Sequence, residues 1–298
     1  MLIATDGSKE ATTALRTAVR LLSPAVCDVD LLCVAPAFPK RWGSARTDYD
    51  YDQRILGETT RILEQARGNL NFDAKLISVL KEIGSASAVI VDKTANYDLT
   101  VIGPKGCGAS RNIGLGAVAS RVVEHALGSV LVARELRSEG GIRVLAAVDG
   151  SRAALRAVET LRSLFDLSST EICLMYVAET PWIQLGLEED WKTYADEDRE
   201  NSEAGALEKE LVREGEAVIE EARNLLRTDF LSVSTRIDEG NPANEILCEA
   251  ERGQYDLIVV GATGARDLKH RMLGSVSSKV AWEAPCSVLV VREPAAQG

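Results

Sequence analysis

The sequence predicts an α/β protein built from two doubly wound, mostly parallel sheets, one in each half of the chain. Two observations predict this fold. The halves repeat each other, and within each half short apolar runs alternate with longer amphipathic ones. We therefore expect one domain over residues 1–137 and a second over 142–294, joined by the polar, glycine-rich linker Ser138-Glu139-Gly140-Gly141.

The two halves match most clearly where strands are expected. LIATDGSK at residues 2–9 reappears as LAAVDGSR at 145–152, 143 positions later. YDLTVIG at 97–103 reappears as YDLIVVG at 255–261, 158 positions later. The second half therefore contains about 15 additional residues, which we place mostly after Val177. Such self-similarity indicates duplication of one domain.

Strand-like and helix-like runs alternate regularly through the first half. Strands are expected at Leu2–Thr5, Val29–Val34, Ala74–Val79, Leu99–Ile102 and Val130–Val132. Helices are expected at Lys9–Leu22, Asp52–Arg67, Ser85–Thr94 and Ala117–Ala126. In the second half, Leu257–Val260 and Val288–Val291 are apolar throughout, as in strands buried on both faces. This order is typical of an open parallel sheet with helices on both sides.

Charge and hydropathy argue against two classes of partner. The net charge of −11 argues against nucleic acid, whose binding needs a basic surface that displaces counterions. No apolar run reaches the roughly 18 residues of a membrane span. Met1 leads directly into the first expected strand, so we expect no signal peptide and a cytoplasmic location.

The negative charge is concentrated in the second half. Residues 1–140 hold 17 basic and 16 acidic residues, whereas 141–298 hold 17 and 29. The segment 188–221 alone contains 14 acidic and 4 basic residues. We interpret this acidic segment as a solvated helix face, and a docking surface for a basic partner is the alternative.

The six cysteines and two histidines form no metal or disulfide motif. No C-x-x-C spacing occurs, and most cysteines lie in apolar runs, which favours small buried side chains over zinc ligands or disulfides. Cys107, between two glycines, is expected on an exposed loop, where a redox role is the alternative. We predict no metal site made by the protein alone.

The residues that indicate chemistry follow the strand at 257–260. Gly261 and Gly264 come directly after it, and Gly274-Ser275-Val276-Ser277 opens the next helix. Glycines let a ligand approach the backbone, and a helix start offers unpaired N–H groups and the positive end of the helix dipole. Ligands of open α/β sheets bind at this edge. The pattern predicts a phosphate site, although each residue alone also fits a turn or a helix cap.

Charged residues are expected at the same edge of the sheet. Asp149 ends the first strand of the second half, where its carboxylate can accept a hydrogen bond from a ribose hydroxyl. Arg266, Lys269 and Arg271, in the loop after Gly264, supply positive charge for a phosphate tail.

In these residues the chain resembles a tandem universal stress protein. The family's mark is G-2x-G-9x-G-(S/T), matched here by Gly261, Gly264, Gly274 and Ser275. The family also has an Asp at the end of strand one, matched by Asp149. The resemblance covers nearly the whole chain, twice.

The resemblance implies Rossmann-like, five-stranded domains that pair through their last strands as a pseudo-dimer. It also implies ATP, with Mg²⁺, the adenine near Val177 and the phosphates over the glycine loop. The implied nucleotide-binding positions are Ala147, Asp149, Val177, Gly261, Ala262, Gly264, Arg266, Gly274, Ser275, Val276 and Ser277. Association of two chains into a further homodimer is left open.

The first half departs from the family pattern. Its weaker second site consists of Thr5, Asp6, Val34, Gly103, Gly106 and Gly116. Ala117 and Ala119 stand where the second half has Ser275 and Ser277, so two hydroxyl groups are lost. At roughly 1 kcal/mol per hydrogen bond, each loss weakens binding by up to about tenfold. We therefore predict that ATP binds chiefly in the second half.

The sequence thus predicts a nucleotide-responsive stress or regulatory module. A slow ATPase on the same fold is the alternative. Efficient hydrolysis is not expected, because the G-x-x-x-x-G-K-[ST] loop and an obvious water-positioning base are missing. A dinucleotide oxidoreductase is disfavoured because no G-x-G-x-x-G follows a first strand. A structural pseudo-dimer without a ligand is the third possibility.

Overall fold

A computed structural model describes most of the chain. The described residues are 1–23, 28–37, 45–70, 76–107, 114–137, 140–179, 203–226, 232–264 and 272–293, without the side chains of 45–53, 76 and 203–208.

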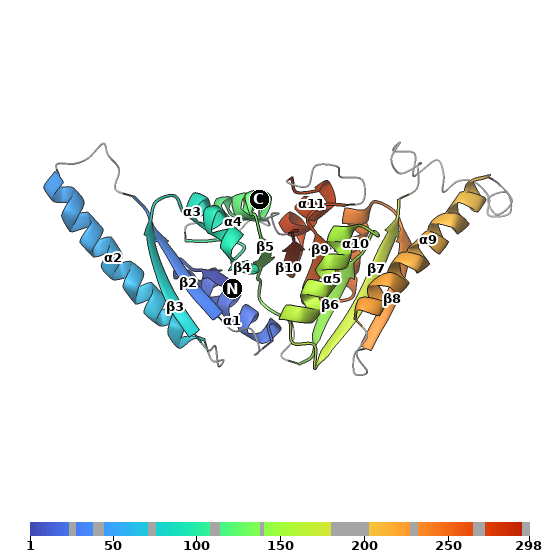
Figure 1. Cartoon of the computed structure of the whole chain (residues 1–298), viewed down its shortest axis with the longest axis horizontal. Helices are drawn as coiled ribbons and strands as arrows, with labels where there is room; N and C mark the ends of the chain where they lie inside the picture. Colours follow the sequence, from blue (N-terminus) through green and yellow to red (C-terminus); the bar gives the residue numbers. More distant parts are fainter. Residues whose placement is uncertain are drawn as a thin grey trace.

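The described strands form one ten-stranded sheet that runs through both halves (Figure 1). The strands are β1 (Leu2–Ala4), β2 (Asp28–Ala35), β3 (Leu76–Ile83), β4 (Leu99–Ile102), β5 (Ser129–Val132), β6 (Ile142–Ala147), β7 (Thr170–Ala178), β8 (Ser232–Glu239), β9 (Leu257–Gly261) and β10 (Ser287–Val291). Their order is β3-β2-β1-β4-β5-β10-β9-β6-β7-β8. All neighbours are parallel except β5 and β10, which pair antiparallel with Leu131 opposite Leu289. The predicted doubly wound α/β fold is confirmed, and the two five-stranded sheets are continuous through their last strands.

Helices cover both faces of the sheet, as the wholly apolar strands predict. The helices are α1 (Lys9–Leu21), α2 (Ala45–Gly68), α3 (Ala86–Lys93), α4 (Ala117–His125), α5 (Arg152–Leu164), α9 (Glu203–Leu225), α10 (Pro242–Arg252) and α11 (Ser275–Glu283), with a short 3-10 turn at Thr94–Asn96. One apolar layer includes Leu15, Leu63, Val158 and Ile219 from α1, α2, α5 and α9. The other includes Ile90, Val122, Ile246 and Val280 from α3, α4, α10 and α11.

The first turn after β1 and β6 is built in the same way in both halves. Ser8 and Ser151 cap α1 and α5, and each hydroxyl accepts the N–H three residues later at 3.1 Å. The preceding aspartates, Asp6 and Asp149, accept the serine N–H at 3.0 Å. Because these turns are short and hydrogen-bonded, they fix both aspartates at the carboxyl ends of the strands.

Polar contacts hold the two halves together beyond the β5–β10 pair. Asp256 is buried and accepts hydrogen bonds from the N–H groups of Arg137 (2.8 Å) and Arg143 (3.0 Å), on either side of the linker. At the ends of α1 and α5, the Ser23 N–H donates to Leu164 O and the Asp166 N–H to Leu21 O, both at 2.9 Å. The halves therefore share backbone hydrogen bonds at several points.

Two elements differ from the sequence expectation. Helix α2 begins at Ala45 rather than Asp52, because its first turns are polar and have no apolar period to mark them. Strand β3 continues to Ile83 rather than Val79. It is the edge strand paired along β2, and polar residues such as Lys81 and Glu82 are tolerated there. Among the described residues, no helix is both long and apolar enough to cross a membrane.

Candidate functional site

A cavity of about 490 Å³ lies at the carboxyl edge of β9, β6 and β7 in the second half. Strands β6 and β7 contribute Ala147, Asp149 and Val177 to its lining. The glycine loop and the start of α11 contribute Gly261, Gly264, Gly274, Ser275, Val276 and Ser277. Nine of the predicted positions thus meet around one cavity.

Of the remaining two predicted positions, only Ala262 is described, and it does not line this cavity. Ala262 is buried, its N–H donates to Val291 O and its carbonyl accepts from the Gly274 N–H, both at 2.7 Å. It therefore closes the loop through its backbone, and its contact with a nucleotide stays a prediction. Arg266 lies outside the described residues, as do Lys269 and Arg271.

Each of the first two loop glycines answers a different steric demand. A Cβ atom at Gly261 would lie 2.7 Å from the backbone carbon of Ala153, so this glycine lets the end of β9 approach α5. A Cβ atom at Gly264 would lie 3.0 Å from Asp149 Oδ2. The second glycine therefore makes room for the Asp149 carboxylate, which also lines the cavity.

The start of α11 forms one wall of the cavity. Gly274 is its N-cap residue, and no side chain caps the helix, so the N–H groups of its first turn face the cavity edge without an intrahelical partner. The Ser275 side chain lines the cavity. The Ser277 hydroxyl donates to Gly261 O at 2.6 Å, so it holds β9 to α11 and is not available as the donor that the sequence predicted.

Eleven lining residues were not predicted from the sequence, and four of them form the far side of the cavity from the glycine loop. They are Tyr176 and Glu179 at the end of β7, and Leu211 and Glu214 on α9. Leu211 and Gly215 lie on the same side of α9 as the buried Ile219. Glu214 is next to this apolar stripe, and its position was a sequence signal that this carboxylate lies near the sheet. Glu179 follows the predicted strand and carried no such signal.

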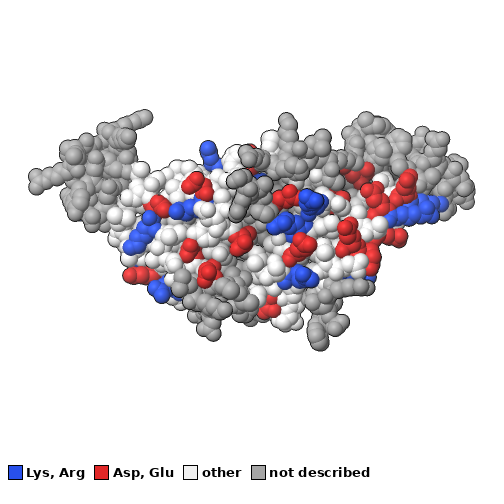
Figure 2. Space-filling view, in the orientation of Figure 1, with Lys and Arg blue, Asp and Glu red and all other residues white. Residues whose placement is uncertain are grey.

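The described cavity wall is acidic. Its charged side chains are Asp149, Glu179 and Glu214, and no described Lys, Arg or His lines it. Figure 2 shows that acidic side chains also gather on the surface at the α9 end of the molecule. Within the described part of the chain, no three His, Cys, Asp or Glu side chains are grouped as metal ligands.

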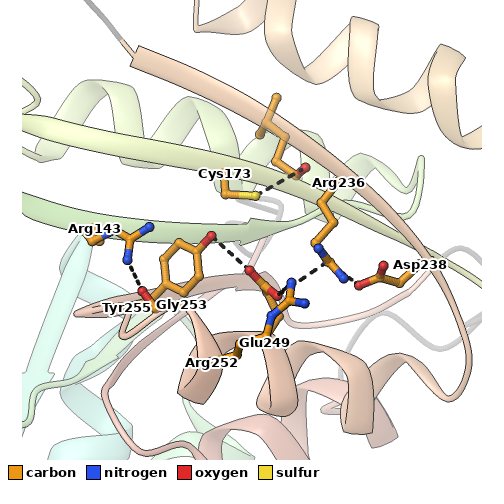
Figure 3. Close-up of polar contacts among 9 residues, drawn as sticks. Arg143, Cys173, Arg236, Asp238, Glu249, Arg252, Gly253 and Tyr255 are labelled. Atoms are coloured by element: carbon orange, nitrogen blue, oxygen red, sulfur yellow. Dashed lines mark hydrogen bonds and ion pairs between the residues drawn. The ribbon is translucent and has the colours of Figure 1, made fainter.

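Helix α10 supplies Pro242 and Ile246 to the cavity and is tied to the sheet by a polar network (Figure 3). The buried Glu249 lies at its centre and pairs with Arg236 (3.4 Å) and Arg252. The Tyr255 hydroxyl donates to Glu249 Oε1 at 3.3 Å. Burial, with Cys173 and Glu249 nearby, raises the pKa of Tyr255, so the phenol stays protonated as the donor.

The corresponding loop in the first half is closed onto its own aspartate. The Cys107 N–H donates to Asp6 Oδ2 at 2.7 Å, and a Cβ atom at Gly106 would lie only 2.5 Å from the same oxygen. Burial opposes ionisation of Asp6, but hydrogen bonds from Ser8 and Cys107 outweigh it, and the pKa of Asp6 lies below its ordinary value. The carboxylate is therefore held as an acceptor by the protein itself.

The predicted first-half positions do not gather around a described cavity as their counterparts do. The cavity described in this half, about 370 Å³, lies between α1 and α2 and is lined by Thr5. Its lining does not include Asp6, Val34, Gly103, Gly106 or Gly116. The third glycine still closes its loop, because the Gly116 N–H donates to Pro104 O at 2.8 Å.

The five described cysteines have the burial that the sequence led us to expect, except for the exposed Cys248, and Cys27 lies outside the described residues. Cys33, Cys173 and Cys286 are buried, whereas Cys107 and Cys248 are exposed, and all five are unpaired thiols. Burial and the neighbouring Asp6 raise the pKa of the Cys107 thiol, which disfavours the reactive thiolate form.

Comparison with known proteins decides the family. The model of the Universal stress protein family matches the chain twice, over residues 1–134 and 142–292. The chain belongs to the universal stress protein family.

Relatives of both lengths occur in this family. A universal stress protein of Mycolicibacterium smegmatis is 26% identical over 302 aligned residues, covering 98% of this chain and 96% of that protein. A universal stress protein of Methanocaldococcus jannaschii is 31% identical over 153 residues, covering 51% of this chain and 82% of its own length. The crystal structure of a universal stress protein from Archaeoglobus fulgidus has the same fold over 98% of this chain and 97% of its own, with a TM-score of 0.64 at 20% identity.

Proposed function

We propose that the second half of this universal stress protein binds ATP and that the chain works as a nucleotide-responsive regulatory module. The observation that carries the proposal is the cavity where Gly264, Gly274 and the open N-terminus of α11 meet. Its volume of about 490 Å³ lies within the range of roughly 300–1,000 Å³ typical of small-molecule sites. Unpaired N–H groups at a helix start favour a phosphate as the ligand group there.

The first half is proposed to bind nucleotide weakly or not at all. Its predicted positions do not line one described cavity together, whereas nine of the second-half positions do. The loss of a hydroxyl at Ala117 still separates the halves. The change from Ser277 to Ala119 should affect ligand affinity less, because the Ser277 hydroxyl already donates its hydrogen bond to Gly261 O.

Magnesium is proposed to accompany the nucleotide. Mg²⁺ is usually held by substrate phosphates and one or two carboxylates, and it keeps several waters. The Asp149 carboxylate on the cavity wall fits that donor set. When bound, the ion would neutralise phosphate charge beside an otherwise acidic wall.

Binding and turnover are separated by two measurements on the purified chain. Acid-denatured protein is first assayed for released nucleotide, and ATP-loaded protein with Mg²⁺ is then followed for phosphate release. We expect adenine nucleotide to be released, with no more than one per chain, and no phosphate release at rates in the enzyme range of about 1–10³ per second. Absence of ATP binding would contradict the proposal, and fast phosphate release would favour the ATPase alternative.

A further inference from the structure

Two of the three acidic residues that line the second-half cavity, Glu179 and Glu214, lie at the end remote from the phosphate loop, whereas Asp149 lies beside Gly264. In the sheet order, β9 and β7 are separated by β6. Adjacent strands are about 4.8 Å apart, so the ends of β9 and β7 are about 10 Å apart. Gly264 and Ser275 lie at the β9 end, and Glu179 follows β7. A nucleotide with its phosphates over the loop would therefore extend its sugar and base toward Glu179.

Helix α9 adds a second carboxylate to the same end. Gly215 packs on the ring of Tyr176, which lies in β7 next to Val177. Glu214 precedes Gly215 and also lines the cavity. The β7 end is thus bordered by one carboxylate from the strand side and one from the helix side.

The first half lacks this arrangement. Both β2 and β7 end in alanine, Ala35 and Ala178, so Pro36 stands where the second half has Glu179. Gly7 packs against Ile62, and its counterpart Gly150 packs against Val218, so Ile62 and Val218 correspond to each other. Glu58 and Glu214 each lie four residues before them and are therefore counterparts.

Glu58 also differs from its counterpart in its charge environment. It forms an ion pair with Arg61 at 2.5 Å, and the residue corresponding to Arg61 in the second half is Ala217. Among the described residues, two carboxylates therefore border the end of β7 in the second half, and the end of β2 in the first half has no such pair.

We propose that Glu179 and Glu214 make the second-half site selective for nucleotides whose ribose carries no phosphate. A ribose hydroxyl can donate a hydrogen bond to a carboxylate, whereas a 2′- or 3′-phosphate would be repelled by two like charges. The inference rests on the proposed nucleotide site. It assigns the ligand class as adenosine 5′-phosphates with both ribose hydroxyls unmodified.

The test compares two ligands that differ by one phosphate. Titration calorimetry with Mg²⁺ measures the affinity of the full chain for ADP and for adenosine 3′-phosphate 5′-diphosphate. We expect the second ligand to bind at least about tenfold more weakly, equivalent to about 1.4 kcal/mol. The ratio of the two dissociation constants is the quantity compared. In the Glu179→Gln/Glu214→Gln variant this ratio should fall to about threefold or less, because the ligand with the 3′-phosphate binds more tightly.

The matched control is Glu58→Gln, which removes the corresponding carboxylate of the first half and should leave the ratio unchanged. A second measurement needs no variant. Raising the salt from 0.1 M to 1 M shortens the screening length from about 10 Å to about 3 Å and should reduce the ratio in the natural protein.

The outcomes separate this inference from the proposed function. If ADP and ATP bind but the ratio is near one, or is unchanged in the Glu179→Gln/Glu214→Gln variant, the selectivity is wrong and the nucleotide site stands. If neither ADP nor ATP binds the natural protein, the proposed function fails and the selectivity fails with it.

Discussion

The ring of Tyr176 lies directly against the backbone of Gly215, so closely that a Cβ atom at position 215 would be 2.5 Å from Cδ1 of the ring. At the corresponding positions of the first half, Cys33 faces Thr59, whose hydroxyl donates to Ile55 O at 2.7 Å. The second half thus pairs a large side chain, Tyr176, with a glycine, Gly215. The first half pairs two side chains of intermediate size, Cys33 and Thr59. The pair sets the distance between α9 and β7 beside the cavity.

Substitution of Gly215 tests this packing. Gly→Ala inside a helix normally stabilises a protein by about 0.5–1 kcal/mol, but the clash with Tyr176 should reverse the sign and cost about 1–3 kcal/mol. The control is Gly57→Ala in α2, where nothing lies within 4 Å of the added Cβ and stabilisation is expected. Urea denaturation measures both. The Tyr176→Cys/Gly215→Thr variant should recover most of the loss, and equal stability of Gly215→Ala and the natural protein would show that the packing is not tight.

The second loop glycine tests the position of Asp149. In Gly264→Ala the added Cβ would lie 3.0 Å from Asp149 Oδ2, so the carboxylate or the loop must shift. We expect at least about a tenfold loss of ATP affinity, or about 1.4 kcal/mol. Competition of ATP with a fluorescent nucleotide measures this affinity. Gly106→Ala is the matched change in the first half and should leave the tight site unaffected. An equal loss in both variants would place tight binding in both halves.

Hydrogen bonds from Ser8 and Cys107 hold the Asp6 carboxylate, and we call this arrangement the Asp6 clamp. It predicts that the unfolding free energy depends on pH. The folded-state pKa of Asp6 lies below its unfolded value of about 3.9, so the clamp contributes stability above that pH and loses it as the pH falls through the folded pKa. The measurement is the difference in unfolding free energy between the natural protein and Asp6→Asn, followed from pH 7 down to strongly acidic pH. The difference should shrink on acidification. A constant difference would show that the Asp6 charge does not hold the loop.

Arg134 tests the junction between the halves. Its guanidinium donates to Cys286 O at 3.0 Å and Ala281 O at 3.1 Å, and burial lowers its pKa to about 10, so it remains charged at neutral pH. Arg134→Ala leaves both carbonyls of the other half without this donor, and we expect a loss of about 2–4 kcal/mol in unfolding free energy. Exposed Arg121→Ala on α4 is the control, expected within about 0.5 kcal/mol. Similar effects of both changes would exclude a stabilising role for Arg134.

Much of the fold follows from the sequence because the repeat and the apolar strands have a direct physical meaning. Strands buried on both faces require helices on both sides, and the matching ends of the halves fix their registers. The start of α2 at Ala45 could not be predicted in this way, because its first turns have no apolar stripe. The continuation of β3 through Lys81 depends on its edge position, which only the assembled sheet determines.

The candidate site was predictable where it depends on local backbone geometry. The glycines, Asp149 and Ser275 lie on short turns whose residue types reflect the conformation required. The side chains of Tyr176 and Glu214 reach the cavity through the packing of α9 on β7, a tertiary contact that the apolar stripe of α9 indicates only in part. The hydroxyl of Ser277 shows the converse, since a predicted ligand donor is used to join β9 to α11.

Titration calorimetry of the nucleotide-free chain with ATP and Mg²⁺ tests whether only the second half binds ATP tightly. We predict a single tight site per chain, which is weakened in Gly264→Ala and kept in Gly106→Ala. Two equivalent tight sites per chain, or no binding at all, would contradict this prediction.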